Sequence, residues 1–271
     1  MLEIRNLSVR LGRRTVLENV TLSARPGELL AICGANGAGK STLLKAVLEE
    51  VPARGTLSLN GHEIGGGRPQ ALARQRAVLP QDTDVAFSFT LAEVVAMGRE
   101  AGDFAARPEV DRLALSAVGL QGREGDDFRT LSGGERQRGH LARALAQVWE
   151  PVGPDGPRWL MLDEPVASLD LGHQLKVMQL ARSFADAGGG VLAIMHDLNL
   201  SAMFADRMAF LVDGQLAALG PPEDVMTEPL LERAYGCAVI LDRVPSSGPW
   251  LLPQNCGPEG AGSSGRNALQ S

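Results

Sequence analysis

Apolar and polar residues alternate through the first 24 positions of the chain, as they do in strands with one buried face. The alternation runs from Leu2 to Val9 and again from Thr15 to Ala24. A third segment, Thr56 to Ile64, contains an Asn-Gly pair that favours a tight hairpin turn. These segments predict an antiparallel β subdomain at the start of the chain.

Four other segments are apolar without interruption, which indicates strands buried on both faces. Such strands are typical of a parallel sheet that helices cover. The four runs are Leu29 to Cys33, Ala77 to Leu79, Trp159 to Leu162 and Val191 to Met195. The sequence therefore predicts an α/β fold with buried parallel strands.

Helical patterns replace the strand patterns between about residues 82 and 147, with breaks predicted at Gly98, Pro108 and Gly119. We interpret this stretch as a helical subdomain inserted in the core. One folded domain is expected over residues 1–253. Residues 254–271 are rich in Gly, Ser and Asn, which predicts a disordered tail.

The composition narrows the possible classes of function. A chain of 271 residues, 44% of them hydrophobic, can bury the core of one large domain. Its formal net charge of −6, with scattered Lys and Arg residues, disfavours nucleic acid as a partner. The chain has no apolar stretch near the roughly 20 residues of a membrane-spanning helix and no signal peptide, so we expect it in the cytoplasm. Its three cysteines lack metal-ligand spacing.

The eight residues after the first apolar run, GANGAGKS, match the phosphate-loop pattern G-x-x-x-x-G-K-[ST]. Glycines let backbone N–H groups close around phosphates at a helix N-terminus, where anions are favoured. Lys40 is expected to neutralise phosphate charge, and the Ser41 hydroxyl is expected to reach Mg²⁺. The residues expected to bind the nucleotide are Gly34, Ala35, Asn36, Gly37, Ala38, Gly39, Lys40, Ser41 and Thr42.

Four polar residues follow predicted strands, and parallel strands carry ligand sites at their carboxyl ends. Asp163 is expected to organise Mg²⁺ and its waters, and Glu164 to polarise the attacking water as general base. Gln81 can bind Mg²⁺ or its water, and His196 can bond the γ-phosphate. These residues predict an enzyme that hydrolyses ATP.

The segment LSGGE, residues 131–135, has the pattern of a capped helix start. Ser132 as N-cap and Glu135 three residues later form a capping box, while Gly133 and Gly134 leave backbone N–H groups open to an anion. The GANGAGKS segment is already expected to bind the phosphates of the subunit's own nucleotide, so LSGGE is not needed for that nucleotide. In a head-to-tail homodimer, LSGGE would instead contact the nucleotide of the other subunit.

The segments GANGAGKS, PQ, LSGGERQ, LMLDEP, SLD and MH, in this order, resemble an ATP-binding cassette (ABC) ATPase over about residues 1–241. The resemblance implies a P-loop NTPase (RecA-like) core, with two cores sandwiching two ATP molecules. It also implies that Ser132 and Gly134 of one subunit touch the γ-phosphate held by the other. Asp170 would lie across the same interface.

Two positions depart from the family pattern. The family usually stacks an aromatic residue of the first strand pair on adenine, whereas this chain has Leu11 there, with Val16 nearby. We therefore expect the packing on the adenine to be weaker or aliphatic. Val166 stands where the family commonly has Thr, and we expect little chemical effect because Glu164 and Asp170 are retained.

The stretch Phe87 to Arg99 resembles the importer branch for iron chelates, cobalamin and haem, in which this surface receives a coupling helix from the permease. Ala144 to Leu160, Leu169 to Gln174 and His196 to Leu200 resemble the haemin-import ATPases. The resemblance implies a homodimeric ATPase that powers haem uptake through an integral membrane permease. It would be peripheral to the cytoplasmic face of the inner membrane, and a periplasmic or surface substrate-binding protein would be an indirect partner.

Two alternatives remain. The ATPase of a ferric-siderophore or cobalamin importer would use the same mechanism, because the binding protein and the permease choose the cargo. A soluble ABC ATPase of repair, translation or iron-sulfur assembly is disfavoured by the single cassette, the acidic charge and the lack of long coiled-coil insertions.

Overall fold

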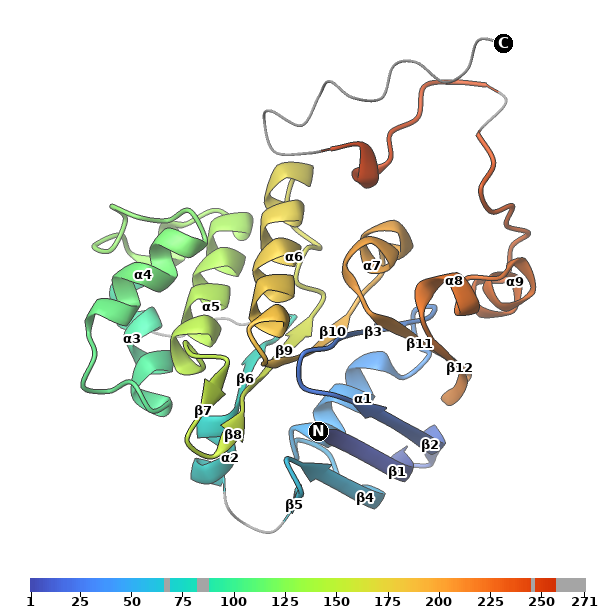
Figure 1. Ribbon diagram of the computed structural model, residues 1–271, viewed down its shortest axis with the longest axis horizontal. Helices are drawn as coiled ribbons and strands as arrows, with labels where there is room; N and C mark the ends of the chain where they lie inside the picture. Colours follow the sequence, from blue (N-terminus) through green and yellow to red (C-terminus); the bar gives the residue numbers. More distant parts are fainter. Residues whose placement is uncertain (66–68, 82–87, 245–246, 257–271) are drawn as a thin grey trace.

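The computed structural model describes residues 1–65, 69–81, 88–244 and 247–256, and Figure 1 shows their arrangement. Two β-sheets pack around helix α1, and further helices cover the other face of the larger sheet. Phe87 and residues 257–271 of the predicted tail lie outside the described residues.

The smaller sheet contains the antiparallel strands predicted from the alternating pattern, in the order β2-β1-β4-β5. Leu2 pairs with Ala24 on one side and with Leu59 on the other, so apolar side chains of three strands meet on the buried face. The strands are β1 (Leu2–Leu11), β2 (Arg14–Ala24), β4 (Ala53–Leu59) and β5 (His62–Glu63).

The larger sheet has the order β12-β11-β3-β10-β9-β6, in which all neighbours are parallel except β12 and β11. All residues of β3, β9 and β10 are buried, as the uninterrupted apolar runs predict. The strands are β3 (Leu29–Cys33), β6 (Arg76–Leu79), β9 (Trp159–Asp163), β10 (Gly190–Ile194), β11 (Arg207–Val212) and β12 (Gln215–Gly220).

Helix α1 (Lys40–Val47) lies between the two sheets, where Leu43 shares a buried cluster with Ile4 of β1 and Ile32 of β3. Alternate residues of β3, such as Ala31, join the cluster on the opposite face, as the period of two of a strand requires. Helices that cover this opposite face are α5 (Gly133–Gln147), α6 (Leu171–Asp186), α7 (Leu198–Phe204), α8 (Pro222–Val225) and α9 (Glu228–Tyr235).

The region predicted to be helical contains α3 (Leu91–Ala101), α4 (Glu109–Ala117) and η1 (Phe128–Thr130), and its helices pack with α5 at one side of the molecule (Figure 1). The break predicted at Gly98 is wrong, because α3 continues through this residue. A Cβ atom at Gly98 would lie 2.0 Å from the carbonyl oxygen of Arg143. This glycine therefore permits the close approach of α3 to α5 instead of ending a helix.

Short elements complete the described chain. They are α2 (Pro69–Gln75), a small hairpin of β7 (Val152–Gly153) and β8 (Gly156–Pro157), and η2 (Pro253–Asn255). No helix within the described ranges combines the length and hydropathy needed to cross a bilayer.

Candidate nucleotide site

The glycine-rich segment forms a tight loop between β3 and α1. Gly34, Gly37 and Gly39 have φ angles of +142°, +81° and +103°, which side-chain-bearing residues rarely adopt. A Cβ atom at Gly39 would also lie 2.5 Å from Cδ2 of Leu17. The loop leads into the N-terminus of α1, which begins after Gly39 without a capping side chain. The helix start is thus open to an anion.

Lys40 is buried at this helix start, and its ammonium group folds back onto the loop. Its Nζ donates hydrogen bonds to the carbonyl oxygens of Gly34 at 2.8 Å and Ala35 at 3.0 Å. Burial lowers the pKa of the Lys40 ammonium, while the charge of Glu164 opposes this shift. The Lys40 ammonium therefore lies against the glycine-rich loop, at the N-terminus of α1.

Ser41 and Asp163 bring a hydroxyl and a carboxylate together from α1 and β9. The Ser41 Oγ donates to Oδ1 of Asp163 at 3.4 Å. Burial and the neighbouring Glu164 charge both raise the pKa of Asp163. Hydroxyl and carboxylate oxygens are the ligands that Mg²⁺ prefers, so this pair fits the predicted metal site.

Glu164 and His196 meet because their strands are neighbours in the sheet. The register pairs Asp163 with Ile194, and each polar residue lies just beyond its strand. Nε2 of His196 lies 2.6 Å from Oε1 of Glu164. The backbone of Glu164 has a φ of +51°, an uncommon value for a residue with a side chain.

A cavity of about 630 Å³ gathers most of the predicted site residues. Leu11 ends β1 with 45% of its surface exposed, and it is not among the described residues that line this cavity. Arg14, which no sequence pattern predicted as a site residue, lines the cavity together with Val16. The lining residues are Arg14, Val16, Asn36, Gly37, Gly39, Lys40, Ser41, Thr42, Gln81, Glu164 and His196.

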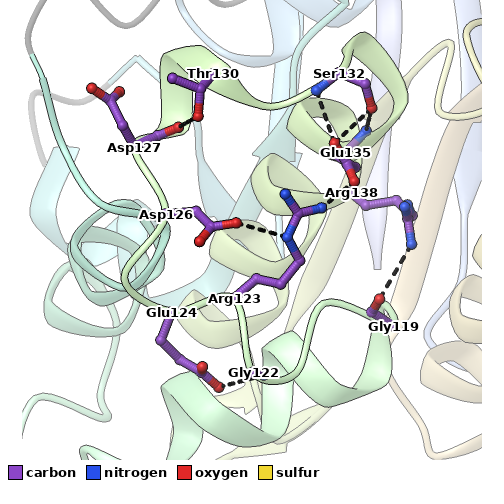
Figure 2. A network of polar contacts seen from close by, with 10 residues as sticks. All are labelled: Gly119, Gly122, Arg123, Glu124, Asp126, Asp127, Thr130, Ser132, Glu135 and Arg138. Carbon is purple, nitrogen blue, oxygen red and sulfur yellow. Dashed lines mark hydrogen bonds and ion pairs between the residues drawn. The ribbon is translucent and has the colours of Figure 1, made fainter.

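The LSGGE segment forms the predicted capping box at the start of α5 (Figure 2). Glu135 Oε2 accepts from the Ser132 backbone N–H at 2.9 Å, while the Ser132 Oγ accepts from the Glu135 backbone N–H at 3.3 Å. The backbone N–H and the hydroxyl of Ser132, which both donate to the Glu135 carboxylate, lower the pKa of Glu135 to about 2. Ser132 and Gly133 are exposed, and neither is among the described residues lining the cavity.

Arg123 fixes this helix start from the preceding loop, as Figure 2 shows. Its guanidinium bonds the second oxygen of Glu135, and its Nε donates to Asp126 at 2.7 Å. Arg138, one turn further along α5, donates to the carbonyl oxygens of Val118 and Gly119. The capping box is therefore attached to the loop that follows α4.

Asp170 is the N-cap of α6 and lies outside the cavity lining given by the described residues. Its Oδ1 accepts from the backbone N–H of His173 at 2.9 Å, and its Oδ2 lies 2.8 Å from the His173 ring. The His173 imidazole is thus engaged locally. The Asp170 side chain is 70% exposed. Val166, which stands where the family commonly has Thr, is buried in the core.

Comparison with known proteins identifies the family. A family model described as "ABC transporter" matches residues 17–167. The hemin import ATP-binding protein HmuV of Jannaschia sp. (strain CCS1) is 51% identical over 93% of this chain and 94% of its own length. HmuV of Roseobacter denitrificans (strain ATCC 33942 / OCh 114) is 50% identical over 93% of this chain and 97% of its own length.

Solved structures agree with the fold. The ATP-binding subunit of an ABC transporter superposes with a TM-score of 0.74 at 27% identity, covering 87% of this chain and 93% of that chain. A dimeric bacterial ABC transporter cassette gives a TM-score of 0.71 at 24% identity, covering 82% and 99%, and shows the fold alone. With its phosphate loop, adjacent carboxylates and capped LSGGE helix, the chain belongs to the ABC transporter family as an ATP-binding ATPase subunit.

Proposed function

We infer that this chain is the ATPase subunit of a haemin importer, which acts as a homodimer bound to an integral membrane permease. The observation that carries this inference is 51% identity to a hemin import ATP-binding protein over nearly the whole of both chains. The subunit would be peripheral to the cytoplasmic face of the inner membrane. A substrate-binding protein on the far side would deliver the haemin to the permease.

The phosphate loop supplies the nucleotide contacts. Backbone N–H groups of residues 34–42 and the Lys40 ammonium receive the phosphates, exchanging the bonds that Lys40 makes with the Gly34 and Ala35 carbonyls. Ser41, Gln81 and Asp163 hold Mg²⁺, which neutralises phosphate charge when bound. Val16 and Leu11 are the proposed contacts to adenine; of these two, Val16 lines the cavity, as Arg14 does.

Glu164 is the proposed general base. It accepts a proton from the water that attacks the γ-phosphate, and general-base catalysis contributes about 10²- to 10⁴-fold. His196, bonded to the Glu164 carboxylate at 2.6 Å, orients that carboxylate and reaches the γ-phosphate with its ring. Both side chains line the cavity that contains the phosphate loop, which supports these roles.

The second subunit completes each site. Ser132, Gly133 and Gly134 are proposed to bind the γ-phosphate held by the partner, because their helix start is capped and two of them are exposed. Asp170 contacts the partner across the same interface. ATP binding closes the dimer, hydrolysis opens it, and the permease follows this motion.

Haemin uptake by vesicles tests the assigned cargo. Vesicles carrying this subunit, its permease and internal ATP are supplied with the binding protein loaded with haemin, a ferric siderophore or cobalamin. ATP-dependent accumulation of haemin alone is expected, and Glu164→Gln abolishes it. Accumulation of siderophore or cobalamin without haemin supports the alternative importers. Failure to copurify with any integral membrane protein supports a soluble ABC ATPase.

A further inference from the structure

Gln137 connects the helix that carries the LSGGE segment to the proposed base of the same chain. It lies on α5, two residues after Glu135, and is half-buried. Its Nε2 donates a hydrogen bond of 3.0 Å to the backbone carbonyl oxygen of Glu164, which follows β9. The two residues are 27 positions apart in the sequence. The bond therefore depends on how α5 is seated against this edge of the sheet.

The backbone that Gln137 contacts is held in an unfavourable conformation. The φ of +51° at Glu164 lies in the left-handed region, which is strained for residues with a side chain and persists only where the surrounding structure fixes it. The Glu164 N–H donates to the carbonyl of Ile194 at 3.2 Å. Its carbonyl accepts from Gln137 and, at 3.3 Å, from the N–H of Ala167. Hydrogen bonds on both sides of the residue thus hold the conformation that directs its carboxylate toward His196.

The oxygen atom of the Gln137 amide makes no hydrogen bond to the described residues. This atom, Oε1, is buried. A buried polar atom without a hydrogen-bond partner is destabilising, because it has lost its bonds to water. A hydrocarbon side chain of the same length would avoid this cost, so packing alone does not account for an amide here. What an amide provides here, and a hydrocarbon side chain could not, is the hydrogen bond to the Glu164 carbonyl oxygen.

The first turn of α5 also packs against the segment that follows Glu164. A Cβ atom at Gly134 would lie 3.3 Å from both the Ser168 carbonyl oxygen and the Leu169 Cδ2. This close approach places the start of α5 against residues 164–170. It brings the Gln137 side chain within hydrogen-bond distance of the Glu164 carbonyl oxygen. One helix thus presents Ser132 outward and, about one turn later, contacts the chain's own hydrolytic segment.

We propose that Gln137 is a positioning residue for hydrolysis, which fixes the backbone of Glu164 in its own chain through the Nε2 donor. This proposal rests on the proposed function, in which Glu164 is the general base. Gln137 acts on the orientation of the carboxylate and not on the phosphate contacts. Its loss therefore lowers turnover and leaves nucleotide affinity intact.

Gln137→Met removes the amide and keeps the length of the side chain, while Gln137→Lys restores an N–H donor. In the purified full-length protein, we expect Gln137→Met to lower kcat about 10-fold with KM for ATP within about 2-fold, because the lost bond orients the proposed base and does not contact the nucleotide. Gln137→Lys should recover part of kcat. A normal kcat in Gln137→Met, or a rise in KM with unchanged kcat, would overturn the proposal.

Gln147→Met provides the matched control at the other end of α5. It removes the same amide, whose Nε2 donates to the carbonyls of Ala73 at 2.8 Å and Arg76 at 3.0 Å. We expect it to lower the thermal midpoint while kcat stays within about 2-fold of the wild type. If both glutamine variants lose kcat equally, Gln137 only stabilises α5 and does not position Glu164, which would contradict the proposal.

Mixed dimers separate the two ways in which Gln137 could act. A Lys40→Ala partner silences one of the two sites, and Gln137→Met is placed either in the subunit that supplies Glu164 to the remaining site or in its partner. Loss of turnover only in the first arrangement supports positioning of the chain's own Glu164. Loss only in the second contradicts it. If Glu164→Gln itself turns over normally, the role proposed for Glu164 as the general base fails. An inactive Glu164→Gln together with a normal Gln137→Met contradicts the inference about Gln137 alone.

Discussion

The Nε2 atom of His196 lies 2.6 Å from Oε1 of Glu164, although the two residues are 32 positions apart in the sequence. The contact follows from the sheet, because β9 and β10 are parallel neighbours with Ile194 opposite Asp163. Each side chain lies just past its strand, at the edge that also receives the phosphate loop after β3. The sheet register thus brings the proposed base and its partner imidazole to one wall of the cavity.

Glu164→Gln should bind ATP but hydrolyse it at least about 100-fold more slowly, since an amide cannot accept the proton of the attacking water. The ATP-bound variant should accumulate as a dimer. Phosphate release measures the first effect, and size-exclusion chromatography with and without ATP measures the second. Near-normal turnover would rule out Glu164 as the base.

Lys40→Ala should weaken ATP binding about 10- to 100-fold, because a charge-assisted hydrogen bond to phosphate contributes about 1.5–3 kcal/mol. Lys45→Ala is the matched control, since Lys45 lies exposed on the same helix and outside the cavity lining of the described residues. Equilibrium binding of a fluorescent ATP analogue distinguishes the two variants. Equal affinity of both variants would contradict the assigned role of Lys40.

Acid should loosen the start of α5 through Glu135. The folded-state pKa of this carboxylate is lowered to about 2 from 4.5, chiefly by its bonds to Ser132. A depressed pKa contributes stability above the unfolded value of 4.5, and the contribution is lost as pH falls from there toward 2. Between pH 5 and about pH 3, the thermal midpoint of the wild type should therefore fall more than that of Glu135→Gln. Parallel pH profiles of the two proteins would contradict this expectation.

Local patterns predicted much of this molecule. Alternating segments predicted the antiparallel strands of the smaller sheet, and uninterrupted apolar segments predicted β3, β6, β9 and β10 of the larger one, because the burial of a strand follows from the pattern of its own side chains. The phosphate-loop glycines and the capping box of Ser132 and Glu135 are likewise local. The roles proposed for Ser132, Gly133, Gly134 and Asp170 concern a second subunit and stay predictions.

Contacts between distant segments could not be predicted in this way. Gly98 signals a helix break by its type, but the close approach of α5 decides its role. Arg14 enters the cavity wall because of where the first hairpin packs, and Arg123 reaches Glu135 from a loop 12 residues away. The bond from Gln137 to Glu164 likewise appears only when α5 is docked on the sheet.

Mixing two inactive variants tests most directly the claim that each ATP is hydrolysed between two copies of this chain. Ser132→Arg blocks the LSGGE contact, and Lys40→Ala blocks the phosphate loop, so each homodimer should be inactive. A heterodimer retains one site with both parts intact, and a 1:1 mixture should recover up to about a quarter of the wild-type ATPase rate, since half of randomly formed dimers are mixed. Activity no higher than that of the separate variants would contradict the shared site.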